Sequence, residues 1–309
     1  GSERFVQVPW DEAEKLVADE IDYVRKTHGN NAIYAGSYGW ASAGRFHHAQ
    51  SQIHRFLNCV GGYTKSLNTY SMAAAEVIVP HVIGDYWGPL NDTTSWDSII
   101  ADTRLVVAFG GIPLKNGQIT PGGVGVHTQR DNGRRAREAG VEFINVSPIK
   151  SDMDEALQSE WIAARPNVDT AIMLGIAHPL HTKNLADLDF LDGYTVGYEK
   201  FADYLTGETD GVVKDARWAA EISEVPAARI VALALEMASK RTMISVSWSL
   251  TRQDHGEQPY WAAITLAAML GTIGLPGGGV GFGYSASNNI GDNYNIMRAK
   301  SLPQGDNPV

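Results

Sequence analysis

The sequence predicts an α/β fold in which parallel strands are covered by helices. Short apolar runs at Leu105–Phe109, Val141–Val146 and Met243–Val246 are typical of buried strands. Longer segments with helical apolar spacing separate these runs, and loops rich in glycine and polar residues follow them. Strands that alternate with helices indicate parallel sheets with covered faces.

The first third of the chain is expected to contain two helices and one strand. Residues 10–28 should form a helix, because Asp11 and Glu14 have the spacing of a capping box and an apolar stripe follows. Ala32–Ala35 should form a short buried strand that leads into the loop GSYGWASAG at 36–44. A second helix is expected at about 45–59.

The remaining helices follow the strands along the chain. A basic helix is expected after the strand Leu105–Phe109, and others should separate or follow the later strands. These helices are predicted at about 127–139, 169–178, 214–222, 226–239 and 259–273. The glycine- and asparagine-rich end of the sequence has no closing element, which leads us to expect part of a longer protein.

Composition excludes several classes of function. The 309 residues carry a net charge of −10, which argues against binding to nucleic acid or to anionic membranes. The sequence has no run of eighteen apolar residues, and its first residues lack the pattern of a signal peptide. The single cysteine, Cys59, excludes an internal disulfide and a four-cysteine zinc or iron–sulfur site within the chain. Motifs for nicotinamide dinucleotides, P-loops, zinc proteases and α/β-hydrolases are absent.

Two short segments carry side chains that suit catalysis. Tyr38 offers a hydroxyl and Trp40 an indole N–H on one loop, and both could point at a bound oxygen or could simply be core aromatics with polar tips. Ser71 precedes a run of good helix formers, so it could be a helix N-cap or a metal-bound alkoxide. Histidines at 47, 48 and 54 have poor spacing for a closed metal site, and we expect them to be structural or surface residues.

In sequence these segments resemble the active-site signature of the dimethyl sulfoxide reductase family, in the branch that reduces S- and N-oxides. SYGW is followed, thirty-three positions from Tyr38 to Ser71, by YSMAAA. The resemblance continues through PLKNGQI at 113–119, INVSPIKSD at 144–152 and ARPNVDTAIMLGIAHPL at 164–180, and it extends over nearly the whole chain.

The resemblance implies a molybdenum-dependent reductase that takes an oxygen atom from an S-oxide or N-oxide and yields the sulfide or amine and water. The implied cofactor is molybdenum held by two molybdopterin guanine dinucleotides, without an iron–sulfur cluster. Ser71 would ligate the metal, while Trp40 and Tyr38 would donate hydrogen bonds toward the transferred oxygen. Trimethylamine oxide reductases of this family lack the tyrosine, so Tyr38 favours sulfoxides.

The resemblance also implies a set of cofactor-binding residues. Asp169 would accept hydrogen bonds from guanine, although it could instead be the N-cap of the following helix. Ser285, Asn288 and Asn289 match the family less securely than the other residues. The full set is Gly39, Trp40, Ser71, Lys115, Asn116, Asn145, Ser147, Pro148, Arg165, Pro166, Asp169, Trp248, Ser249, Arg252, Gln253, His255, Ser285 and Asn288.

Members of the family have four domains, and this chain is expected to supply the two Rossmann-like α/β domains. We place the first at 1–103 plus 248–309, with the active-site loop and Ser71, and the second, which binds guanine dinucleotide, at 104–247. The implied partners are the oxide substrate and a cytochrome or other electron donor, in the periplasm or alternatively the cytoplasm. The alternatives are a related molybdopterin oxidoreductase with another substrate or direction, or a non-catalytic cofactor-binding fragment.

Overall fold

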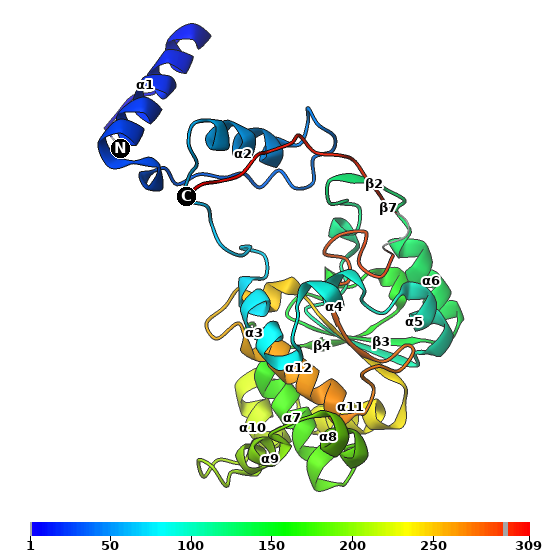
Figure 1. Cartoon of the computed structure of the whole chain (residues 1–309). Coiled ribbons are helices and arrows are strands. Elements are labelled where there is room, and N and C mark those ends of the chain that lie inside the picture. The colour runs from blue at the N-terminus through cyan, green and yellow to red at the C-terminus, as the bar shows by residue number, and fades with distance from the viewer. Residues whose placement is uncertain (1, 293–295) are drawn as a thin grey trace. The chain divides into compact units, whose positions relative to one another are not determined.

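The computed structural model describes residues 2–292 and 296–309, which form two compact units (Figure 1). The sheet unit consists of residues 68–120, 125–292 and 296. The N-terminal unit consists of residues 2–67, 121–124 and 297–309. Each unit has its own set of contacts and is described separately below.

The sheet unit is built on five parallel strands. They are β1 (Leu105–Phe109), β3 (Glu142–Ser147), β4 (Glu160–Ala163), β5 (Thr242–Val246) and β6 (Gly279–Phe282). Their order across the sheet is β4-β3-β1-β5-β6, and every neighbouring pair is parallel. The chain therefore moves outward from β1 to β4, returns to the other side of β1, and moves outward again. This is the doubly wound order, in which ligands bind beyond the carboxyl ends of the strands at the point of reversal, here between β1 and β5.

The strand sequences explain which strands could be predicted. All five side chains of β1 and all five of β5 are buried, as the apolar runs indicate. β3 is also almost wholly buried and was predicted to within one residue. β4, with the sequence EWIA, is mostly exposed, and β6, with GVGF, is half glycine, so neither carries a strand signal.

Ten helices of the sheet unit flank or extend the sheet. α7 is buried on nearly all sides from Ala171 to Leu180 because it packs against α10, α11 and α12. α12 in turn packs on β5 and β6, and α5 contacts α6. The helices are α3 (Ala73–Ile83), α4 (Trp87–Asn91), α5 (Trp96–Asp102), α6 (Gln129–Glu138), α7 (Asp169–Thr182), α8 (Leu188–Tyr194), α9 (Tyr198–Thr206), α10 (Ala216–Ser223), α11 (Ala227–Ser239) and α12 (Gln258–Met269).

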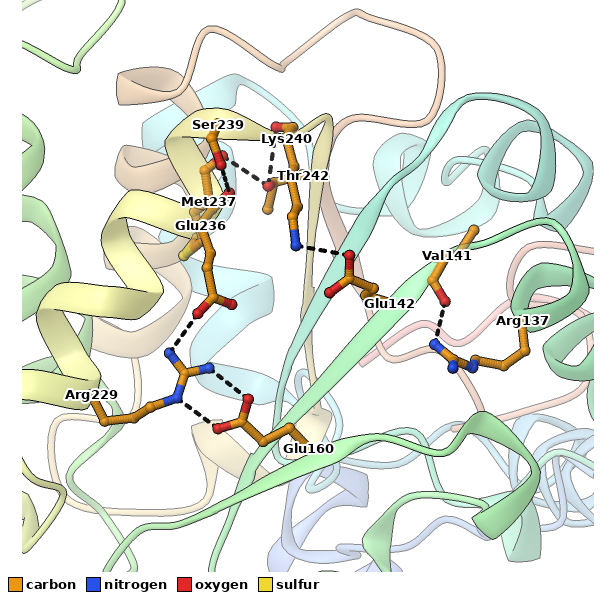
Figure 2. Close-up of polar contacts among 10 residues, drawn as sticks. All are labelled: Arg137, Val141, Glu142, Glu160, Arg229, Glu236, Met237, Ser239, Lys240 and Thr242. Atoms are coloured by element: carbon orange, nitrogen blue, oxygen red, sulfur yellow. Dashed lines mark hydrogen bonds and ion pairs between the residues drawn. The ribbon is translucent and has the colours of Figure 1, made fainter.

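Ion pairs close the amino-terminal edge of the sheet, as Figure 2 shows. Glu160, the first residue of β4, accepts two hydrogen bonds from Arg229 of α11, at 2.6 and 2.8 Å. Arg229 also binds Glu236 at 3.1 Å, and these carboxylates raise the pKa of its guanidinium. Glu142, which begins β3, pairs with Lys240 at 2.8 Å. The charges at this edge are thus paired with one another.

The N-terminal unit contains α1 (Trp10–His28), the short 3-10 helix η1 (Asn30–Ala32) and α2 (Ala49–Cys59). The C-terminal residues lie on α2: Leu302 N–H donates to Ser51 Oγ at 3.2 Å, and Asn58 Nδ2 donates to the carbonyl of Gln304 at 3.1 Å. A two-stranded sheet of β2 (Gly123–Gly125) and β7 (Ile296–Arg298) belongs mostly to this unit. Among the described residues, no helix is both long and apolar enough to span a membrane.

The predicted α/β class is confirmed, and so are α1 and the helices after each predicted strand, to within a few residues at their ends. Two details of the N-terminal unit were wrong. α1 begins after Pro9 without a side-chain cap, so the Asp11 capping box is not formed. The predicted strand Ala32–Ala35 is only an isolated bridge from Tyr34 to Thr64, because α1 buries none of its residues and leaves Tyr34 65% exposed.

The second helix begins at Ala49 rather than 45, because the His48 ring accepts the Ser51 N–H at 3.2 Å and caps it. The compact units also have other bounds than the two predicted domains, 1–103 plus 248–309 and 104–247. One reason is that β6, from the first predicted domain, pairs with β5 of the second. The described residues form one five-stranded parallel sheet rather than two. The domain division of a whole family member stays a prediction.

Candidate cofactor site at the carboxyl ends of the strands

Most of the predicted cofactor-binding residues follow the carboxyl end of a strand in the sheet unit. Each strand contributes one segment: 110–116 after β1, 147–148 at the end of β3, 165–169 after β4, 247–255 after β5 and 283–288 after β6. In a parallel sheet all carboxyl ends lie at one edge. The structure therefore brings these segments to the edge opposite the ion pairs of Figure 2.

The segment after β1 turns sharply on two glycines. Gly110 and Gly111 have φ values of +82° and +76°, and a Cβ on Gly111 would lie 2.1 Å from the carbonyl oxygen of Asp152. The turn leads to Lys115 and Asn116 in the 3-10 helix η2 (Leu114–Asn116), where both side chains are exposed. Lys115 lies 3.4 Å from the Asp152 carboxylate, a weak pair that leaves most of its ammonium in solvent.

A cavity of about 220 Å³ lies beside this turn. Its polar lining suits a polar ligand better than an apolar one. The lining residues are Leu114, Gly117, Gln118, His127, Gln129 and Arg130.

Asn145 and Ser147 of β3 are both buried. Asn145 Nδ2 donates to the carbonyl of Lys150 at 3.3 Å, while its Oδ1 has no partner in the described part of the chain. Ser147 Oγ lies 3.3 Å from Asp152 Oδ2, and its carbonyl accepts the indole N–H of Trp161 at 2.8 Å. Pro148, the next residue, is exposed. The contacts of Ser147 thus hold Asp152 and Trp161 in place, while the Oδ1 atom of Asn145 can still accept a hydrogen bond.

Asp169 is the first residue of α7, after the β4 segment with Arg165 and Pro166 exposed. The alternative N-cap role of Asp169 is wrong, because Val168 occupies that position and α7 has no side-chain cap. Burial raises the pKa of the Asp169 carboxyl to about 6, and the N–H of Asp169 itself opposes the shift. Arg165 pairs instead with Glu224 at 3.6 Å. The surroundings of Asp169 therefore destabilise its ionised form, and a carboxyl with such a raised pKa is typical of a binding residue.

The segment after β5 begins with the 3-10 helix η5 (Trp248–Thr251), capped by Ser247. The indole Nε1 of Trp248 is buried and has no acceptor among the described residues. Gln253 donates through Nε2 to the carbonyl of Leu250 at 2.8 Å, but its Oε1 is buried and unpaired. The other predicted residues of this segment, Ser249, Arg252 and His255, are exposed.

The segment after β6 is hydrogen-bonded to α6 and to the loop that follows η2. Ser285 is buried and accepts a hydrogen bond from Gln129 of α6. Both polar atoms of the buried Asn288 side-chain amide lack partners within the described residues, while its backbone N–H donates to the carbonyl of Ile119 at 2.9 Å. Asn289, which with Ser285 and Asn288 matches the family less securely, is buried as well. A fully unpaired buried amide indicates a missing polar partner.

Ser71 belongs to the sheet unit and lies beside η5. Its alternative role as an N-cap is wrong, because Met72 holds that position in α3 and no side chain caps the helix. The carbonyl of Ser71 accepts from Thr251 Oγ1 at 3.4 Å. Glu76 Oε2 accepts the N–H of Thr69 at 3.1 Å and so anchors the same loop from the other side. The Ser71 side chain is half-buried on a loop that is fixed at both ends.

Tyr38, Gly39 and Trp40 belong to the N-terminal unit. Tyr38 is 50% exposed and Trp40 is half-buried, so neither is a core aromatic of this unit. Gly39 packs so tightly on α2 that a Cβ would lie 2.6 Å from that of Ala49. Their proposed action on an oxygen at Ser71 stays a prediction.

Two residues of the site were missed from the sequence. Gly283, with φ +80°, lies against Trp248, and a Cβ there would be 2.1 Å from Nε1. Gln129 both lines the cavity and binds Ser285. The position of Gly283 depends on β6, which has no strand signal in the sequence. The three histidines expected to be structural or surface residues are so: His48 caps α2, His54 is hydrogen-bonded to Gln304 at 2.9 Å, and His47 is exposed.

A doubly wound sheet with unpaired buried polar groups at its carboxyl edge defines the molecule as an α/β cofactor-binding protein. The chain belongs to the molybdopterin oxidoreductase family, whose model matches residues 1–304. It is 46% identical to a biotin sulfoxide reductase of Cereibacter sphaeroides, over the whole chain and 42% of that protein. It is 42% identical to a dimethyl sulfoxide/trimethylamine N-oxide reductase of the same species and to a trimethylamine-N-oxide reductase of Haemophilus influenzae, over 93% of the chain and 35% of each protein.

A solved structure supports the fold. Acetylene hydratase from Pelobacter acetylenicus aligns with a TM-score of 0.57 at 19% identity, over 88% of this chain and 34% of that one. The chain thus spans well under half the length of the relatives it matches.

The residues at the carboxyl edge fit the cofactor of this family, molybdenum held by molybdopterin. The unpaired atoms comprise donors, on Trp248 and Asn288, and acceptors, on Asn145, Gln253 and Asn288. A pterin presents both kinds of group, and burying polar atoms without such a partner would be costly.

Proposed function

We propose that this chain contributes the catalytic core of a molybdenum-dependent reductase that removes an oxygen atom from an S-oxide, or from an N-oxide, to give the sulfide or amine and water. The observation that carries the proposal is the 46% identity with a biotin sulfoxide reductase over all 309 residues. That stretch includes the loops with Tyr38, Trp40 and Ser71. The S-oxide is favoured because Tyr38 is present.

We propose two molybdopterin guanine dinucleotides as the cofactor form, with no iron–sulfur cluster. When bound, this group supplies two-electron oxygen-atom transfer. Asp169 would bind the guanine of one dinucleotide, since a carboxylate can accept from both N–H groups on one edge of that base. Lys115, just after the turn at Gly110 and Gly111, would be the cation for a pyrophosphate. The Gly110 N–H would not take part, since it donates to the carbonyl of Val146 at 2.9 Å.

Ser71 would hold the metal through its side-chain oxygen, and its loop is anchored for that role by Thr251 and Glu76. Trp40 and Tyr38 would donate hydrogen bonds to the substrate oxygen as charge builds on it. Each such donor is worth about 1–3 kcal/mol in a site that excludes water. An electron donor, such as a cytochrome, and a periplasmic setting complete the proposal.

The test is the oxide reductase activity of the purified protein, with a reduced viologen dye as electron donor. We expect Tyr38→Phe to lower kcat/KM for a dialkyl sulfoxide by about 10-fold, and to lower that for a trialkylamine N-oxide less. Tyr23→Phe, a change at an exposed tyrosine of α1, is the matched control and should leave both values unchanged. Wild-type protein that holds molybdenum but reduces neither oxide would contradict the proposal and favour another substrate or direction.

A further inference from the structure

Three buried polar atoms without partners lie in the sheet unit, one of them on α3, the helix that follows the Ser71 loop. They are Glu76 Oε1, the Tyr86 hydroxyl and the Tyr260 hydroxyl, none of which has a hydrogen-bond partner in the described part of the chain. Tyr86 is 1% exposed and Tyr260 is fully buried. We call these three side chains the buried path. None of the three is among the predicted cofactor-binding residues.

The members of the buried path come from elements that pack together. Glu76 lies on α3, Tyr86 precedes α4 and Tyr260 lies on α12, and α3 contacts both α12 and η5. The rings of Tyr86 and Tyr260 each stack on Phe282, with centroids 5.9 and 5.2 Å away. Phe282 therefore holds both phenols in one aromatic stack.

The groups of the buried path also influence one another electrostatically. Burial, and then the Glu76 carboxylate, raise the pKa of Tyr86. Burial, and then Tyr86, raise the pKa of Tyr260, while Arg252, whose side chain is exposed, lowers it.

Glu76 connects this path to the Ser71 loop. One carboxylate oxygen, Oε2, accepts the N–H of Thr69, two residues before Ser71. The other, Oε1, faces the interior unpaired. Thr251, the neighbour of Arg252, also borders this loop, because its hydroxyl donates to the Ser71 carbonyl at 3.4 Å.

We infer that Glu76, Tyr86 and Tyr260, bridged by buried water, form a proton relay that supplies the oxygen released beside Ser71. The inference rests on the proposed function. One S-oxide, two protons and two electrons from the donor give one sulfide and one water, so every turnover consumes two protons. A site that excludes bulk water needs a route for them.

The chemistry of the three groups suits a relay. Buried polar atoms that lack protein partners are the usual sites of internal water. A phenol that stays neutral can accept a proton on its oxygen while it donates its own to the next group. Glu76 is the carboxylate that takes up a proton at the end nearest Ser71 and releases it to the oxygen.

The experiment measures kcat, KM, molybdenum content and Tm of the holoenzyme and four variants, with a dialkyl sulfoxide as substrate. Glu76→Gln keeps an acceptor for the Thr69 N–H but has no proton to pass on. Tyr86→Phe and Tyr260→Phe remove a hydroxyl that has no hydrogen-bond partner among the described residues, so both variants should still fold, with only a small change in Tm. We expect kcat to fall about 10-fold or more in all three, with KM within about twofold and molybdenum content unchanged.

Tyr198→Phe is the matched control. Tyr198 of α9 is half-buried and outside the cofactor-binding segments, and its hydroxyl is hydrogen-bonded to Nδ1 of His181 at 2.9 Å. This variant should lose Tm and keep kcat, the reverse of the pattern expected for Tyr86 and Tyr260.

The relay is wrong if kcat of the three path variants stays within about twofold of wild type, or if it falls only in proportion to lost molybdenum. A wild-type protein without molybdenum and without S-oxide reduction would instead overturn the proposed function itself, and the relay with it. The two failures are distinguished by the wild-type measurement alone.

Discussion

Replacing Asp169 by asparagine should stabilise the cofactor-free protein at neutral pH and weaken its hold on guanine. Burial raises the pKa of this carboxyl from the usual 3.8 to about 6. At about 1.4 kcal/mol per pKa unit, the ionised form costs the folded state up to about 3 kcal/mol. The side chain is partly exposed, so solvent screens some of this cost, and we expect Asp169→Asn to raise the free energy of unfolding by about 1–2 kcal/mol.

The gain must depend on pH in a definite direction. The folded protein binds the Asp169 proton more tightly than the unfolded chain, so its stability falls as pH rises from 3.8 to about 6. The loss of stability caused by ionising Asp169 is absent below pH 3.8 and complete above about pH 6. Asp169→Asn should therefore match wild type at about pH 4 and exceed it at about pH 7.

Urea denaturation of cofactor-free protein at both pH values checks this prediction. Asp189→Asn is the matched control, because Asp189 also lies in the first turn of a helix but is exposed. A gain that is equal at the two pH values, or a loss of stability at pH 7, would refute the reasoning. In the holoenzyme, the same substitution should lower the guanine nucleotide content.

Two further changes test the two edges of the sheet by urea denaturation. Gly283→Ala places a Cβ 2.1 Å from Trp248 Nε1 at φ +80° and should destabilise the protein by about 2 kcal/mol or more; a smaller loss would mean that Trp248 is free to move. Glu160→Gln should cost about 1 kcal/mol by weakening the two-bond pair with Arg229, and it should cost nothing when Arg229 is already methionine. Equal losses in both backgrounds would show that the pair contributes nothing.

The strands of the sheet unit could be predicted from the sequence wherever a buried strand carries a mostly apolar run. β1, β3 and β5 carry such runs, and a helix separates β1 from β3. β4 and β6 could not be predicted, because exposure of Trp161 and the glycines of β6 remove the signal. The order of the strands in the sheet could not be predicted either, since it depends on which strands pair across long connections.

The candidate site follows the same division. Asp169 and Trp248 were expected from the family resemblance, but the costly environment of Asp169 and the unpaired indole of Trp248 are properties of the packed structure. Glu76 and Tyr86 carry no motif of their own. Their arrangement became visible only when α3, α12 and β6 were seen to pack together.

The most direct test of the account is the molybdenum and released guanine nucleotide content of the purified protein, beside Ser71→Ala. Ser66→Ala, a change at an exposed serine of the N-terminal unit, is the matched control. We predict about one molybdenum and about two guanine nucleotides per wild-type protein, with S-oxide reduction that Ser71→Ala loses and Ser66→Ala keeps. Protein without metal or nucleotide, or a Ser71→Ala variant with wild-type activity, would contradict the central claim that this chain builds a molybdenum site around Ser71.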